Sequence, residues 1–384
     1  MHCGELPRLN GSIFSGGASV PAMLNIVNMG DEDGFISDLR CPYQKRGNMP
    51  EKAVRTFEHT LPNVNRKWDS SLDGEGLFLI DERYICLDAD QRVQTIDLAN
   101  ELVNYAADEN SPVRTQAAMI GSVYFGQKNG IPFVQAGGYN IGKSDADKPR
   151  WCIVRTKKWE LVRHIEAIGI PCFPSSETIR ITKDKGLSFS FASELGIPQP
   201  DALLTTPMNL YAADVEYPVV MKRLDSNKGS NVFYISDEFG LYRYGEMLEK
   251  DDYILLQKAM PTGDDMRVQV ICGKIYDVLL RHQSEKDFRS NLDFGGKAEG
   301  GTLTAEEEKI VHRIVEGLPD GAGRSGFICV DFLFDENGNA VLGELNAMPG
   351  IKRLHDTDPV KFNAIVDFYI SQIRSVLDGE QDCS

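Results

Sequence analysis

The chain has 384 residues, of which 42% are hydrophobic, and a formal net charge of −16. This length is enough for two domains, or for one domain with a large elaboration. The negative charge disfavours broad binding to nucleic acid, because a phosphate backbone requires a basic surface. No apolar run approaches the roughly 20 residues that span a bilayer, and the N-terminus lacks a signal pattern, so we expect a cytoplasmic protein with no membrane partner.

Eight cysteines are scattered along the chain, and no two of them form a Cys-x-x-Cys pair. This spacing indicates neither a zinc site nor a redox motif. We therefore expect reduced and mostly buried thiols.

The N-terminal part of the chain gives few clear elements, because Gly, Pro, Asn and Asp interrupt residues 1–112 often. Short apolar runs predict strands at residues 76–81 and 84–88. Residues 95–107 have a helical pattern.

The second half alternates more clearly between strands and helices. Apolar runs predict strands at residues 152–155, 217–222, 232–235, 253–258, 267–271 and 275–281. Amphipathic periodicity predicts helices near residues 161–168, 183–195, 239–249 and 305–316. The last helix begins with a capping box, in which Glu307 follows Thr304 by three residues. Together these elements predict a mixed α+β fold.

Residues 330–348 predict a hairpin with acidic side chains on one face. Two apolar runs flank Asn337-Gly338, a dipeptide typical of a two-residue type I′ turn. A turn centred there pairs residues whose numbers sum to 675. The expected pairs are Phe334 with Val341, Leu333 with Leu342, and Asp331 with Glu344.

The pair Asp331 and Glu344 predicts a metal site. Two carboxylates directly opposite each other destabilise a sheet, with Cβ atoms roughly 4.5–5.5 Å apart, unless a cation lies between them. Asn346 projects from the same face as Glu344. Carboxylate and amide oxygens are typical ligands of Mg²⁺, which completes its shell with water and substrate phosphates. From this segment alone, the alternative is a solvent-exposed polar face.

Cationic residues precede the hairpin at strand ends and in loops. Lys222 ends the run PVVMK and is followed by a loop, so it can reach a phosphate that backbone N–H groups cradle. The loop does not have the P-loop pattern. Other polar residues in similar places are Lys185, Arg267, Arg281, Arg289 and Asn291. Each is ordinary alone, but together they suit a cleft that binds phosphate and metal.

Six segments between about residues 151 and 355 resemble, in order, the RimK-type ATP-grasp ligases. They read ITKDKGLSFSFASELGIPQP, YPVVMKRLDSNKGSNVF, ILLQKAM, GDDMRVQVICGKI, DFRSNLDFGGKAEGGTLTAEE, and VDFLF with GELNAMPG. The resemblance implies an ATP-grasp fold, in which two α+β subdomains clasp ATP, after an enlarged N-terminal α/β domain. The expected domains are residues 1–182 and 183–376, with a C-terminal tail at 377–384. Residues 1–150 match no family.

The same resemblance implies roles for individual residues. Lys185 and Lys222 would hold the phosphates of ATP, and Lys258 and Ala259 would meet the adenine, largely through backbone groups. Asp265 would lie near the ribose.

For the reacting groups, the resemblance implies that Asp331, Glu344 and Asn346 bind two Mg²⁺ ions, with Mn²⁺ as an alternative. Arg281 would stabilise the charge that develops during phosphoryl transfer. The remaining residues of the nucleotide and phosphate site would be Gly229, Ser230, Gln257, Arg267, Arg289, Ser290 and Asn291, of which Arg289 and Asn291 are also expected to be catalytic.

Two positions depart from the family's pattern. The loop after Lys222 contains Gly229 as its one glycine, whereas the family's loop is usually richer in glycine. Lys258 stands where an acidic residue is common, although the expected contact there uses the backbone.

The resemblance implies a Mg-ATP-dependent carboxylate–amine ligase. A substrate carboxylate would attack the γ-phosphate of ATP to give an acyl phosphate and ADP, and an amine would then form the amide and release phosphate. Three alternatives stay open: a ligase that forms an ester or amide on a peptide side chain, a small-molecule kinase, and a non-catalytic regulatory protein that binds ATP. The sequence names neither the two substrates nor any homo-oligomeric state.

Overall fold

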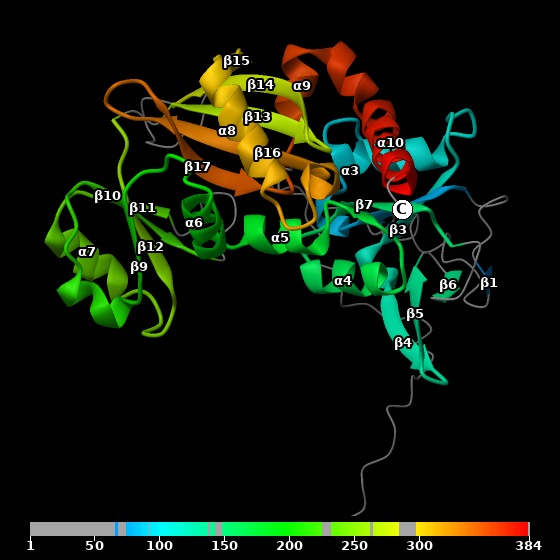
Figure 1. Cartoon of the computed structure of the whole chain (residues 1–384), viewed down its shortest axis with the longest axis horizontal. Coiled ribbons are helices and arrows are strands. Elements are labelled where there is room, and N and C mark those ends of the chain that lie inside the picture. The colour runs from blue at the N-terminus through cyan, green and yellow to red at the C-terminus, as the bar shows by residue number, and fades with distance from the viewer. Residues whose placement is uncertain are drawn as a thin grey trace, which may run out of the picture. The chain divides into compact units, whose positions relative to one another are not determined.

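A computed structural model describes residues 66–67, 74–90, 92–136, 139–142, 148–224, 232–261, 264–283 and 297–382 (Figure 1). All of these ranges belong to one compact unit, Cys41–Ser384. Within the described ranges the strands form four sheets. Of the helices described, none is both long and apolar enough to cross a membrane.

A parallel sheet with the strand order β3-β2-β7-β8 lies before the predicted ligase region. Its two central strands are buried along their whole length, as expected when helices cover both faces of a parallel sheet. Alternate residues serve the two faces: Phe78 and Ile153 share a cluster with helices α3 and α10, and Leu79 and Val154 share one with α4. The bounds are β2 (Gly76–Ile80), β3 (Thr115–Met119), β7 (Trp151–Arg155), β8 (Cys172–Phe173), α3 (Leu98–Ala107), α4 (Trp159–Ala167) and α10 (Pro359–Asp382).

A second small sheet has the order β1-β6-β5-β4, which the sequence analysis does not predict. Its β4–β5 hairpin closes through Asn129 and Gly130, both at positive φ, as a two-residue primed turn requires. The bounds are β1 (Arg66–Lys67), β4 (Tyr124–Lys128), β5 (Ile131–Ala136) and β6 (Tyr139–Gly142).

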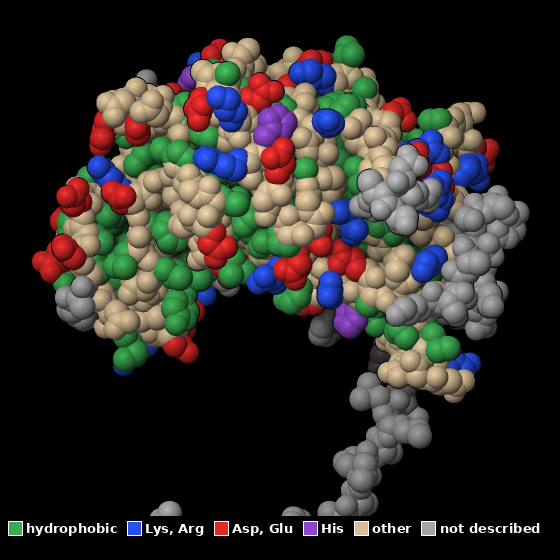
Figure 2. All heavy atoms as spheres, in the orientation of Figure 1, with side chains coloured by type: hydrophobic (Ala, Val, Ile, Leu, Met, Phe, Trp, Pro, Cys, Tyr) green, Lys and Arg blue, Asp and Glu red, His purple; other side chains and the backbone are tan. Residues whose placement is uncertain are grey.

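The region from residue 183 contains two antiparallel sheets. The smaller has the order β11-β10-β12-β9, and its own hydrophobic cluster includes Leu241 of α7. Hydrophobic side chains are numerous on this part of the molecule in Figure 2. The large hydrophobic residues that are exposed in this region include Leu203, Met208 and Phe239. The bounds are β9 (Ala202–Thr205), β10 (Val219–Arg223), β11 (Val232–Ile235), β12 (Ile254–Lys258) and α7 (Glu238–Gly245).

The larger sheet has the order β15-β14-β13-β16-β17, and helix α8 lies across one of its faces (Figure 1). Along the chain, α5 and α6 lie between β8 of the parallel sheet and β9 of the smaller antiparallel sheet, and α9 leads into α10. The bounds are β13 (Asp265–Ile271), β14 (Lys274–His282), β15 (Lys297–Gly300), β16 (Phe327–Phe334), β17 (Ala340–Asn346), α5 (Ser176–Lys183), α6 (Lys185–Glu194), α8 (Ala305–Glu316) and α9 (Lys352–Thr357).

Most predicted elements are confirmed with shifts of a few residues, and β11 and α8 have the predicted bounds. The capping box is present, because the Thr304 side chain accepts from the Glu307 N–H and the Glu307 side chain accepts from the Thr304 N–H. The predicted strand at residues 84–88 is wrong. A 3₁₀ helix (Glu82–Tyr84), which the side chain of Asp81 caps by accepting from the Arg83 N–H, ends at the start of this segment. In the rest of the segment, Leu87 pairs with Val93 in an isolated bridge.

Among the cysteines that the structure describes, Cys86 differs from the expectation. Cys152, Cys172, Cys272 and Cys329 are free and buried, as predicted, but Cys86 is disulfide-bonded. The spacing of cysteines in a sequence does not show which of them meet in space, so the prediction of uniformly reduced thiols fails at Cys86.

The predicted domain boundary, between residues 182 and 183, falls just before the last residue of α5. Two hydrophobic clusters contain residues from both sides of it, since Val154 and Val268 share one cluster, and Phe78 and Phe327 share the other. The boundary itself stays a prediction. The expected C-terminal tail continues helix α10 as far as Asp382.

Candidate functional site

The two faces of the five-stranded sheet differ in chemistry. Met266, Val268, Val330 and Phe332 point to one face and join the core beneath α8. Because side chains alternate along a strand, the intervening residues line the opposite face. The register places these polar residues next to one another on β14, β13, β16 and β17: Arg281, Asp265, Arg267, Asp331 and Glu344.

Asp331 lies opposite Glu344, as predicted, but the hairpin reaches this register by another route. Its connection spans residues 335–339 instead of two residues, because the carboxylate of Asp335 accepts from the N–H groups of Asn337 and Asn339 and favours the longer loop. The predicted partners of Leu333 and Phe334 are therefore wrong by one residue.

A bulge beside Asp331 restores the predicted register. The pairing shifts between Asp331 and Phe332, which leaves Gly343 without a partner on β16. A Cβ atom at position 343 would lie 2.9 Å from Cγ of Leu333 and 3.2 Å from the carbonyl oxygen of Asp331. Glycine therefore permits the close approach that brings Glu344 opposite Asp331.

Asp331 is buried and ion-paired with two arginines. Arg267 donates to it from Nε at 2.8 Å and from Nη2 at 2.5 Å, and Nη2 of Arg281 lies 3.2 Å from Oδ2. Burial pushes the pKa of Asp331 upward, but the charges of Arg267 and Arg281 outweigh it and hold the pKa below its usual value. The carboxylate is therefore ionised and held in a fixed orientation.

Arg281 has a second carboxylate partner. Its Nε and Nη2 donate to the two oxygens of Asp265 at 2.5 and 2.6 Å. Both carboxylate oxygens of Asp265 thus accept hydrogen bonds from Arg281. The contact of Asp265 with a ribose stays a prediction.

Glu344 faces a pocket that Lys185 and Lys222, the two lysines predicted to bind phosphate, also line. Its Oε1 lies 3.6 Å from Nζ of Lys185, and its side chain is 47% exposed. The pocket lies between strands β10 and β12 of the smaller antiparallel sheet, helix α6 and strand β17. Its lining residues are Thr182, Lys185, Ser188, Phe189, Gln199, Lys222, Leu255, Gln257, Leu342, Gly343, Glu344 and Leu345.

Local structure positions each lysine. Asp184 caps α6, since its Oδ1 accepts from the N–H groups of Gly186 and Leu187, and this fixes Lys185 as the first helical residue. Lys222 is on β10, and its Nζ donates to Oε1 of Gln257 at 2.6 Å. Burial lowers the pKa of Lys222 to about 8, although Glu344 opposes the shift.

The donor set fits a hard divalent cation. Asp331 and Glu344 are a cross-strand pair, and Asn346 lies on the same strand face as Glu344. In the described part of the chain, no three His, Cys, Asp or Glu side chains are grouped as a metal site. Two carboxylates and one amide suit Mg²⁺, which keeps waters and takes phosphate oxygens. The assignment of all three residues as ligands stays a prediction.

At the expected adenine site, two backbone N–H groups already donate hydrogen bonds within the protein. The N–H of Lys258 donates to the carbonyl of Asp201 at 2.8 Å, and the N–H of Ala259 donates to that of Pro218 at 3.0 Å. Both of these N–H groups are therefore engaged within the protein, and the contact of the two residues with an adenine stays a prediction. The Lys258 ammonium lies 3.3 Å from Oε1 of Glu336.

Five predicted site residues lie outside the described ranges: Gly229, Ser230, Arg289, Ser290 and Asn291. Lys157, which follows β7, is a charged residue that no motif in the sequence indicates. Burial lowers the pKa of Lys157 to about 8, and the charge of Glu344 opposes this shift. The available signal was its position after a strand in a parallel sheet, where ligand-binding loops gather.

His282, next to Arg281, gives a testable pH dependence. Its Nδ1 lies 2.9 Å from Oδ2 of Asp264 and its Nε2 lies 3.4 Å from Oε1 of Glu299, and the hydrogen bond to Asp264 raises its pKa above the usual 6.5. Protonated His282 therefore stabilises the folded state at pH values below the pKa that His282 has in the unfolded chain. This contribution is lost as the pH rises through the pKa of His282 in the folded protein. In an NMR titration we expect Asp264→Asn to lower the pKa of His282, and an unchanged titration would exclude this pairing.

Solved structures establish the fold of the chain as ATP-grasp. A RimK domain ATP-grasp protein from Sphaerobacter thermophilus matches with a TM-score of 0.53 and 16% identity, over 77% of this chain and 98% of that one. D-alanine–D-alanine ligase from Bacillus anthracis, complexed with ATP, matches with a TM-score of 0.52 and 18% identity, over 80% and 99%. At these identities the likeness concerns the fold.

Sequence comparisons point to a more specific family for the second half of the chain than the structural matches do. The model of the RimK-like ATP-grasp domain matches residues 182–366. A probable alpha-L-glutamate ligase of Haemophilus influenzae is 27% identical over 240 residues, which are 60% of this chain and 77% of that protein. Residues 182–366 therefore match the RimK-like ATP-grasp domain, and the resemblance inferred from the sequence motifs is confirmed.

Proposed function

We propose that the chain is a Mg-ATP-dependent ligase that joins a carboxylate to an amine through an acyl phosphate, with release of ADP and phosphate. The observation that carries this proposal is one pocket in which Lys185, Lys222 and Glu344 meet beside Asp331. Phosphoryl transfer depends on such positioning and charge neutralisation more than on a protein nucleophile.

In this proposal the lysines bind and orient the phosphates of ATP. Lys185 is fixed at the start of α6, and Lys222 is held by Gln257. Because burial has lowered the pKa of Lys222, a phosphate oxygen beside it favours the charged ammonium and gains a strong hydrogen bond.

Asp331, Glu344 and Asn346 would hold the metal, and Mg²⁺ there would neutralise charge on the phosphates. Arg267 and Arg281 keep Asp331 ionised and oriented. Arg281 also lies at the edge of this site, where its charge can favour a transferring phosphoryl group.

The name of the Haemophilus influenzae relative favours L-glutamate as one substrate to test first. Small molecules and peptides are both candidates for the carboxylate substrate and for the amine substrate. A cytoplasmic location is part of the proposal, because it would supply Mg-ATP, and the disulfide of Cys86 is the observation that argues against it.

Incubation with Mg-ATP, L-glutamate and a panel of carboxylates and amines tests the proposal. We expect release of ADP that requires both substrates, together with a condensed product detected by mass. Release of AMP would contradict the proposed chemistry. A stable phosphorylated product would indicate a kinase, and nucleotide binding without turnover would indicate a regulatory protein.

Replacement of Lys222 by Ala should weaken ATP binding about 10-fold or more, because a hydrogen bond to a charged group contributes ~1.5–3 kcal/mol. Calorimetric titration with a non-hydrolysable ATP analogue measures this effect. Lys309→Ala is the control, since Lys309 is exposed on α8. Equal affinity of the Lys222→Ala protein and the wild type would remove Lys222 from the site.

A further inference from the structure

Arg155 is a charged side chain in the interior of the protein. It is the last residue of β7 and is 1% exposed. A buried guanidinium is costly unless its donors find partners. Its contacts therefore indicate what it does.

Three polar contacts hold the Arg155 guanidinium, whose Cζ also lies 5.9 Å from the centroid of the Tyr84 ring. Its Nη2 donates to Oδ1 of Asp97 at 3.0 Å and to the carbonyl oxygen of Pro349 at 3.1 Å, and its Nη1 lies 3.9 Å from Sδ of Met348. Among the described residues its Nε has no hydrogen-bond partner. The ion pair with Asp97 compensates the charge, whereas the contacts with residues 348–349 connect β7 to a segment 193 residues away in sequence.

That segment follows the strand that carries the predicted metal ligands. Strand β17 ends at Asn346. The N–H of Met348 donates to Oδ1 of Asn346 at 2.9 Å, so the turn itself holds the amide oxygen. Oδ1 has a second lone pair, which a cation can use.

The contacts form a continuous path from Arg155 to the site. Arg155 fixes the carbonyl of Pro349, the turn fixes the N–H of Met348, and this N–H orients Asn346. Asp97, which anchors the guanidinium, is itself fixed as the N-cap of α3 through the Ala99 N–H.

We propose that Arg155 is a positioning residue that holds residues 346–349 so that Asn346, beside Glu344, presents its amide oxygen to a divalent cation. This inference rests on the proposed function, in which these residues bind Mg²⁺. It adds a role for the parallel sheet, which precedes the RimK-like domain: the end of β7 determines the geometry of the metal site.

Mn²⁺ binding tests the inference without relying on turnover. Free Mn²⁺ would be measured by electron paramagnetic resonance in the presence of a non-hydrolysable ATP analogue, for the wild type, Arg155→Lys and Arg155→Met. Loss of a group that orients a metal ligand typically weakens metal binding about 10–100-fold. We expect about a 10-fold loss or more for Arg155→Met, a smaller loss for Arg155→Lys, and unchanged binding of the analogue in EDTA.

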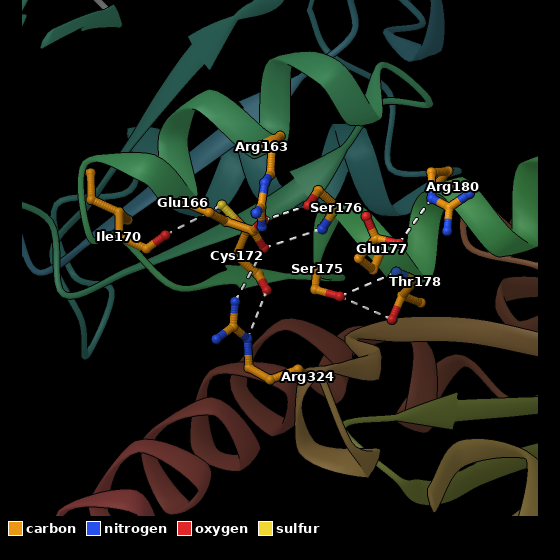
Figure 3. A network of polar contacts seen from close by, with 10 residues as sticks. All are labelled: Arg163, Glu166, Ile170, Cys172, Ser175, Ser176, Glu177, Thr178, Arg180 and Arg324. Carbon is orange, nitrogen blue, oxygen red and sulfur yellow. Dashed lines mark hydrogen bonds and ion pairs between the residues drawn. The ribbon is translucent and has the colours of Figure 1, made fainter. Parts of the chain in front are cut away.

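Arg324 provides the matched control, because it makes the same kinds of contact in a different place (Figure 3). Its Nε donates to the carbonyl of Cys172 at 3.1 Å and its Nη2 donates to Oε1 of Glu166 at 3.2 Å. These partners lie on β8 and α4, and neither belongs to β17 or to residues 346–349. Arg324→Lys should lower the melting temperature and leave Mn²⁺ affinity unchanged.

The outcomes separate a positioning role from a structural one. Arg155 variants that fold and bind Mn²⁺ as tightly as the wild type would overturn the inference, as would an equal loss in Arg324→Lys. Arg155→Lys keeps a charge for Asp97, so it serves as the folded variant if Arg155→Met does not fold. A wild-type protein that binds ATP but no Mn²⁺ would overturn the proposed function and the inference together.

Discussion

Replacement of Glu344 by Gln should reduce ATP turnover at least about 100-fold while the protein stays folded. The substitution keeps the size of the side chain and removes the charge that faces Asp331 across the hairpin. Loss of one group that stabilises a transition state costs about 10²–10³ in kcat. Turnover is measured as ADP release at saturating ATP with the substrates found in the panel, and the fold is checked by the melting temperature.

Glu306→Gln is the matched control for this variant. Glu306 is 75% exposed on α8 and pairs with Lys309 on the helix surface. The control should turn over ATP like the wild type. A folded Glu344→Gln protein with near-normal turnover would exclude Glu344 as a metal ligand.

Replacement of Arg267 by Met should lower the free energy of unfolding by about 3 kcal/mol. Removal of one partner from a buried ion pair costs about 3–5 kcal/mol, because the other charge is left without its counter-charge. The lower end applies here, since Arg281 stays 3.2 Å from Asp331. Urea denaturation followed by circular dichroism measures the change.

The control for stability is Arg180→Met. Arg180 pairs with Glu177 at 2.8 Å on α5 (Figure 3), but the two side chains are 37% and 31% exposed. Such a pair contributes about 0.3–0.5 kcal/mol. If both substitutions had equally small effects, the ion-paired cluster around Asp331 would not be important for stability.

The hairpin shows how far local sequence rules can predict a site. Counting from Asn337-Gly338 places Asp331 opposite Glu344, which is correct. The rule does not include the carboxylate of Asp335, which lengthens the loop, or the bulge at Gly343, which compensates. Two local errors of opposite sign cancel, so the register at the carboxylates is right while the turn is wrong.

Contacts between distant strands are the part that the sequence could not predict. Lys185, Lys222 and Glu344 are recognised from motifs, and they meet in one pocket. The ion pairs of Asp331 with Arg267 and Arg281 depend on the order of β14, β13 and β16, which no short motif contains.

The parallel sheet was harder to predict for the same reason. Its strand β2 pairs with both β3 and β7, which follow at long intervals in the sequence. Helix α5 was missed because its residues SETIRITK have few apolar side chains, although Ser175 caps it through the N–H of Thr178. Arg155 could be recognised as a link to the site only once the strands were in place.

Transfer of ¹⁸O from the carboxylate substrate tests the central claim most directly. The substrate identified in the panel is labelled in its carboxylate, and the protein turns over Mg-ATP with the amine present. If the carboxylate attacks the γ-phosphate and the amine then displaces phosphate from the acyl phosphate, one ¹⁸O appears in each inorganic phosphate and none in ADP. Label in AMP, or phosphate without label, would contradict the proposed ligase.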